Sequence, residues 1–69
     1  MPRFRMKQTV KLVSDTVQGG ALVLSGTPGT VEGVQLLRDG RMRYRVIFDG
    51  PGPGESDALT LSESEITEG

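Results

Sequence analysis

The chain has 69 residues, enough for one small domain. A domain of this size buries only about 60% of the surface that its unfolded chain exposes, so we expect no deep catalytic cleft. It has no cysteine and no histidine, which excludes disulfides, thiolate nucleophiles, imidazole bases and the usual zinc sites. The net charge is −1, but residues 1–48 hold all eight basic side chains and residues 49–69 hold six acidic ones and no basic one. No apolar run is long enough for a signal or a membrane span, so we expect a cytoplasmic protein.

A basic lead-in precedes the first predicted strand. In residues 1–7, Phe4 and Met6 alternate with cationic side chains, so this segment either opens a strand or frays with its two apolar residues tucked against the core. Residues 9–13 alternate apolar and polar positions and are rich in β-branched side chains, which predicts a strand. The glycine-rich residues 14–29 are then expected to form a loop.

The predicted loop 14–29 is long for a small domain, and long loops are often binding segments. The alternative is that Leu22 and Leu24 close one end of the core while the glycines let the chain turn back. At the end of the loop, Thr27-Pro28-Gly29-Thr30 has the residues that a type II turn prefers, with proline second and glycine third. A strand over residues 30–37 is expected to follow this turn.

The clearest structural signal is a β-hairpin in which Asp39-Gly40 joins two alternating segments. A two-residue turn there would place Leu37 opposite Met42. Glycine in the middle of the first strand, at Gly33, indicates a bend or a bulge. The remaining predicted pairs are Gln35 with Tyr44, Gly33 with Val46 and Val31 with Phe48.

The two faces of this hairpin differ in character. Met42, Tyr44, Val46 and Phe48 fall on the inner face. The outer face combines cationic and apolar side chains, and six of them are the candidate partner-binding residues: Arg41, Arg43, Arg45, Val34, Leu36 and Ile47. A purely solvated face would pair Glu32 with Arg45 across the strands. Three apolar side chains beside three arginines favour instead a surface that docks an acidic partner.

The C-terminal third predicts short elements only. Residues 50–57 contain glycine and proline and are expected to form a loop, and residues 58–61 a short strand. Ser62 and Glu65 have the spacing of a capping box, which predicts a 3-10 turn before a last strand at residues 66–67.

Together these elements predict an all-β domain over residues 1–69, an SH3-like, partly open barrel of about five short antiparallel strands with a 3-10 turn before the last strand. The predicted core is Val10, Leu12, Val31, Leu37, Met42, Tyr44, Val46, Phe48, Leu59, Leu61 and Ile66.

Four segments carry a likeness to known proteins: Thr9-Val10-Lys11-Leu12, Gly29-Thr30-Val31-Glu32-Gly33-Val34, Tyr44-Arg45-Val46-Ile47-Phe48-Asp49 and residues 59–66. In order and spacing they resemble the small SH3-like barrels of the electron-transport accessory type, found among the accessory proteins of photosystem I and of ferredoxin reductase. The Gly-x-Val pieces also resemble KOW-type barrels. The first resemblance implies a docking or assembly role, frequently for acidic redox proteins, with no cofactor of its own. The second implies RNA binding.

No residue pattern predicts catalysis. The hydroxyl side chains have no histidine partner, and Gly26-Thr27-Pro28-Gly29-Thr30 lacks the Gly-Lys-Ser/Thr ending of a phosphate-binding loop. We therefore expect no enzyme activity, no metal site and no cofactor. The predicted function is a non-catalytic interaction or accessory module that docks an acidic protein or joins a larger complex. The alternative is a KOW-like nucleic-acid binder, and self-assembly through open edge strands is a third reading.

Overall fold

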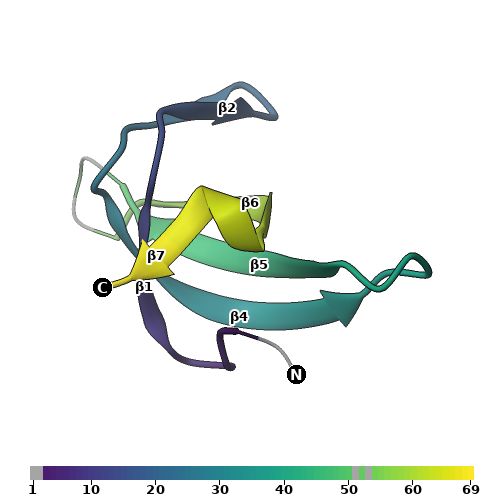
Figure 1. The fold of residues 1–69 in the computed structure, drawn as a ribbon. Coiled ribbons are helices and arrows are strands. Elements are labelled where there is room, and N and C mark those ends of the chain that lie inside the picture. The colour runs from purple at the N-terminus through teal and green to yellow at the C-terminus, as the bar shows by residue number, and fades with distance from the viewer. Residues whose placement is uncertain (1–2, 51, 53) are drawn as a thin grey trace.

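The computed structural model describes residues 3–50, 52 and 54–69, which form an all-β domain (Figure 1). The elements of this described part are, in chain order, β1 (Thr9–Leu12), β2 (Thr16–Gln18), β3 (Ala21–Val23), β4 (Pro28–Leu36), β5 (Met42–Asp49), β6 (Ser56–Ser62), the 3-10 turn η1 (Glu63–Glu65) and β7 (Ile66–Glu68). Five strands form one antiparallel sheet in the order β6-β5-β4-β1-β7, and β2 pairs with β3 alone. The larger sheet is not closed, because β6 and β7 remain its edges. The predicted all-β, partly open fold with a 3-10 turn before the last strand is confirmed.

The core follows the period of two that a strand imposes on its side chains. Buried positions alternate with exposed ones along β1, β5 and β6. The prediction is wrong for Leu37, which is only partly buried, while Met42 lies at the core margin. The core residues are Phe4, Val10, Leu12, Val23, Val31, Tyr44, Val46, Phe48, Leu59, Leu61 and Ile66.

The lead-in forms no strand over the described residues 3–7, but Phe4 is fully buried. Its ring meets the ring of Tyr44 edge-on, with 5.4 Å between centroids. The Tyr44 hydroxyl accepts the backbone N–H of Arg3 (3.0 Å) and donates to Oε2 of Glu63 (2.9 Å). Desolvation of this hydroxyl is the main cause that raises the pKa of Tyr44. The lead-in is therefore held against β5 and η1 by both packing and hydrogen bonds.

The hairpin between β4 and β5 forms, but its predicted register is wrong by one residue at the turn. Met42 pairs with Leu36, not with Leu37. Of the two expected turn residues, Gly40 alone has a positive φ, of 88°. The N–H of Gly40 bonds the carbonyl of Leu37 (3.0 Å), and the N–H of Leu37 bonds the carbonyl of Arg41 (2.8 Å). This is a three-residue loop that ends on a left-handed glycine, an alternative that Asp-Gly serves as well as a two-residue turn.

A bulge in β4 shifts the register a second time. The pairing changes between Val31 and Gly33, which confirms the bulge predicted at this glycine. Gly33 lies opposite Arg45, however, and not opposite the valine that the predicted register placed there. Because Glu32 is the extra residue, Val31 and Val34 both pack on the core although they are three positions apart.

The predicted loop 14–29 is wrong for much of its length, because it contains the β2–β3 hairpin. Gly19 and Gly20 have φ angles of 54° and 82°, and two successive positive values are what a type I′ turn requires. Gln18 therefore lies opposite Ala21 across a two-residue loop. In Figure 1 this hairpin stands on the opposite side of the molecule from the lead-in.

Val23 anchors the hairpin to the core, with 4% of its surface exposed. The expectation that Leu22 and Leu24 close the core is wrong, because both are more than half exposed. Alternation along β3 explains the difference, since a strand that turns Val23 inward must turn its two neighbours outward.

The predicted type II turn at residues 27–30 is also wrong. Pro28 and Gly29 already belong to β4, and the turn lies earlier, at Gly26, with a φ of 82°. Gly29 is required by close packing and not by a turn. A Cβ there would lie 2.7 Å from Cδ1 of Phe48 and 2.8 Å from Cγ1 of Val46, so this position has no room for a side chain.

The end of the chain follows the prediction. The carboxylate of Glu65 accepts the backbone N–H of Ser62 (2.9 Å), which fixes η1 as the capping-box spacing indicated. The turn then delivers Ile66 opposite Leu12, where β7 pairs with β1. The strand β6 begins at Ser56, earlier than expected from its apolar residues alone.

Candidate docking face

Two of the predicted site arginines lie on one exposed side of β5. Arg43 and Arg45 are two positions apart on the strand, so both point away from the core, and Ile47 follows on the same side. Both arginines are exposed, whereas Ile47 is half-buried. We call Arg43, Arg45 and Ile47 the arginine face.

The residues that flank these arginines are small or uncharged. Gln35 and Ser62 lie opposite Arg43 on the two neighbouring strands, and Gly33 and Thr60 lie opposite Arg45. A shallow hollow of about 330 Å³ opens beside the guanidinium groups and is lined by Gly33, Val34, Gln35, Arg43, Arg45 and Thr60. The arginines therefore stand above their neighbours, with space for an incoming group next to them.

The acidic residue that we expected to neutralise the arginine face has another partner. Glu32, the expected partner of Arg45, instead bonds Nζ of Lys7 at 2.7 Å. The cause is the bulge, which displaces Glu32 from the regular cross-strand position. Among residues 3–50, 52 and 54–69, neither Arg43 nor Arg45 forms an ion pair within 4.0 Å. Both keep their charge available for a partner molecule.

Arg41 does not belong to this face. It lies next to the three-residue loop, where its Nε contacts Oδ2 of Asp39 at 2.6 Å. The backbone N–H of Arg41 also donates to Asp39 (3.0 Å), and this bond, followed by the guanidinium contact, lowers the pKa of the Asp39 carboxyl. Arg41 thus closes its own turn.

The structure does not bring the six predicted site residues together. Val34 faces inward with Tyr44 and packs on the core. Leu36 pairs with Met42 and shares the side of the sheet that Met42 occupies, although 67% of its surface is exposed. Both expectations failed because the register of β4 is one residue away from the predicted one. Of the predicted set, Arg43, Arg45 and Ile47 share a face.

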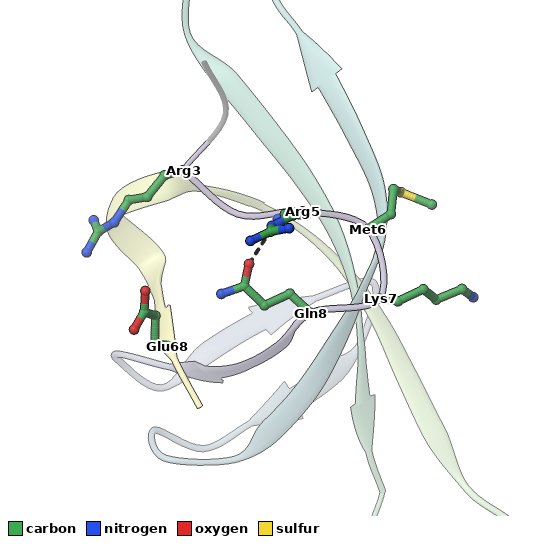
Figure 2. Close-up of a pocket in the computed structure, with 6 residues that line it drawn as sticks. All are labelled: Arg3, Arg5, Met6, Lys7, Gln8 and Glu68. Carbon is green, nitrogen blue, oxygen red and sulfur yellow. Dashed lines mark hydrogen bonds between the residues drawn. The ribbon is translucent and has the colours of Figure 1, made fainter.

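A second group of cations surrounds a hollow of about 400 Å³ at the lead-in. Figure 2 shows Arg3, Arg5 and Gln8 on one side of this segment. The backbone N–H of Arg5 donates to Oε1 of Gln8 (3.0 Å). Met6 and Lys7 point the other way. The same hollow also contains a carboxylate, that of Glu68, which offsets part of its positive charge. Among the described residues that line the hollow of the arginine face, none is acidic.

All aromatic side chains of the chain are buried. Phe4, Tyr44 and Phe48 each have 0% of their surface exposed, and the sequence has no other aromatic residue. No ring is therefore available to stack on an unpaired base. Contacts of the arginine face with nucleic acid would be limited to phosphates.

Sequence reasoning missed one feature close to β6. The amide of Gln18 makes two hydrogen bonds with the backbone of Thr60, one to its carbonyl (2.8 Å) and one from its N–H (3.1 Å). This contact ties the β2–β3 hairpin to the open edge of the sheet. The Gly19-Gly20 pair was the available signal, because such a pair between alternating residues is typical of a two-residue hairpin turn.

No protein-family model, no curated protein and no solved structure matches this chain. Across the described ranges, no three potential metal ligands of the His, Cys, Asp or Glu type come together. Nor does any helix of that part of the chain have the length and apolarity needed to cross a membrane.

Proposed function

We propose that this protein is a non-catalytic interaction module that docks an acidic protein partner on its arginine face. The observation that carries the proposal is the absence of an ion-pair partner for Arg43 and Arg45 in the described part of the chain, together with the open hollow beside them. Two uncompensated cations on an interior strand of the sheet attract an acidic surface and orient it as it approaches. Ile47 supplies an apolar contact next to them, which water leaves when the partner docks.

A protein partner fits this face better than nucleic acid. The buried aromatic residues offer no stacking surface, and the sequence pI of about 5.2 is low for a nucleic-acid-binding domain. Phosphate contacts alone would give binding without sequence preference. The KOW-like reading therefore stands as the alternative that the experiment must test.

The test compares two charge-reversal variants of equal net charge. Arg43→Glu with Arg45→Glu changes the arginine face, whereas Lys11→Glu with Arg38→Glu changes two exposed cations elsewhere. Quantitative pull-down with the tagged chain should lose its acidic partners with the first variant and keep them with the second. Binding should also weaken as salt rises, since salt screens exposed charges.

Two results would count against this function. If both variants capture the same proteins as the wild type, the arginine face is not the docking surface. If gel-shift assays show that micromolar protein retards RNA or DNA at low salt, and Arg43→Glu with Arg45→Glu abolishes the retardation, the arginine face binds nucleic acid.

A further inference from the structure

We infer that the acidic hollow between the β2–β3 hairpin and the start of β6 binds a second partner, an extended peptide segment in which basic and apolar side chains alternate. This inference is independent of the arginine face. It depends on three observations that meet between the β2–β3 hairpin and the edge strand β6: exposed apolar side chains, unpaired carboxylates and a free strand edge.

The apolar side chains come from the hairpin. Val17 and Leu22 pair across β2 and β3, with 68% and 61% of their surfaces exposed, and Leu24 is 56% exposed. The hairpin is not a loose arm, because Val23 is buried in the core and Gln18 is bonded to Thr60. A fixed segment that holds several large apolar residues in water is typical of an interaction site.

The carboxylates lie next to these residues. A hollow of about 260 Å³ lies between the hairpin, the end of β5 and the start of β6. It is lined by Leu22, Val23, Leu24, Thr27, Asp49, Gly50 and Asp57. Neither Asp49 nor Asp57 has a cation within 4.0 Å in the part of the chain that the structure describes. The two leucines offer an apolar wall to the stem of a lysine or arginine, and the aspartates can bind its charged end.

The free edge of β6 is suited to an extended ligand. Thr60 turns its N–H and C=O away from β5, toward Gln18. Because these groups alternate in direction along a strand, Ala58 and Ser56 turn theirs to the same free edge. The N–H of Ser62, the fourth in this series, bonds Glu65. In the described residues, the edge groups of Ser56 and Ala58 have no hydrogen-bond partner.

Asp57 lies between Ser56 and Ala58 and also lines the hollow, so the free edge and the acidic apolar pocket adjoin. A peptide strand added along β6 would pair with Ser56 and Ala58 and direct alternate side chains toward the hollow. The arginine face has the opposite charge, so this edge and that face select different partners. The protein would then connect a basic segment to an acidic protein.

The experiment titrates the isotope-labelled full chain with a capped hexapeptide in which lysine and valine alternate, and follows the backbone amide signals by NMR. We expect saturable shifts at residues 21–24 and 56–58. Peptides that alternate glutamate with valine, or lysine with serine, should bind at least about tenfold more weakly, since each lacks one of the two recognised features.

Two variants make the test specific. Leu22→Ser should weaken the lysine-valine peptide at least about tenfold, whereas Leu36→Ser, at an equally exposed leucine outside the hollow, should leave it unchanged. The inference fails if the lysine-valine peptide gives no saturable shift at millimolar concentration, or if the glutamate-valine peptide binds as well. It also fails if both serine variants behave alike, or if sedimentation shows that the chain dimerises and that Leu22→Ser makes it monomeric.

Discussion

Replacing Gly29 with alanine tests the packing of β4 on β5 most directly. The added Cβ would lie 2.7 Å from Cδ1 of Phe48, 2.8 Å from Cγ1 of Val46 and 2.9 Å from the carbonyl oxygen of Ile47. Carbon atoms in contact normally stay about 3.5–4.0 Å apart, so these neighbours must move by about 1 Å. Two of them belong to fully buried side chains and the third is backbone, so little of this movement is free.

The expected cost is at the upper end of the range for overpacking, about 2–3 kcal/mol. The total stability of a chain of 69 residues is only about 3–10 kcal/mol, so this substitution removes a large share. Gly29 does not have a positive φ, and exchanging such a glycine for alanine would otherwise stabilise the fold by about 0.4–1 kcal/mol. A measured loss therefore reports the steric clash.

Guanidinium unfolding followed by far-ultraviolet circular dichroism measures this loss. With an m-value of about 2 kcal/mol/M, the midpoint should fall by about 1–1.5 M. Gly33→Ala is the matched control, because its Cβ meets a single atom, Cβ of Arg45, at 3.3 Å and its site is partly exposed. If Gly29→Ala is as stable as the wild type, the packing argument is wrong. If Gly29→Asn is tolerated better than Gly29→Ala, the position behaves as a turn glycine and the packing argument is also wrong.

Three further predictions concern hydrogen bonds and backbone strain. Tyr44→Phe should lower the free energy of unfolding by about 1–2 kcal/mol, because the buried backbone N–H of Phe4 loses its acceptor and the carboxylate of Glu63 loses a donor. Since the folded pKa of Tyr44 is raised above 10.0, the wild type should lose stability as pH rises above 10.0, and Tyr44→Phe should abolish this loss. The absorbance of this single tyrosine reports its ionisation. A tyrosine that ionises at its ordinary pH would contradict the prediction. Lys7→Gly should raise the melting temperature modestly, because Lys7 has a φ of 69°, which glycine adopts without steric strain. The exposed ion pair with Glu32 that is lost contributes at most about 1 kcal/mol. A clearly lower melting temperature would show that the backbone at Lys7 is not strained. Gln18→Ala should speed amide exchange at residues 58–60 and in the hairpin, whereas Gln35→Ala should not, and equal exchange in both variants would show that the contact with β6 does not hold the hairpin.

Much of the fold follows from local patterns. Alternation along residues 42–48 was sufficient to assign the inner and outer sides of β5, since side chains of a strand alternate whatever the strand pairs with. The capping box at Ser62 and the bulge at Gly33 were equally local, because each depends on the conformations open to one or two residues. Of the candidate site, Arg43, Arg45 and Ile47 share a face for the same reason.

The register in which β4 pairs with β5 could not be predicted from the sequence. Asp39-Gly40 suits a two-residue and a three-residue loop equally, and only the packing of β4 on β5 selects between them. That choice moved Val34 and Leu36 off the predicted face. The bulge at Glu32 separately gave this carboxylate to Lys7, so the exposed charge of the arginine face results from the tertiary structure.

The amino-acid sequence by itself determined the all-β class, the sides of β5 and the turn before β7, because these depend on interactions within a few residues. Only the tertiary structure decided the burial of Phe4, the close packing of Gly29 and the position of the β2–β3 hairpin beside β6. Each of these brings together residues far apart in the chain. Such contacts depend on shape and volume in three dimensions, which a linear pattern of residue types does not specify.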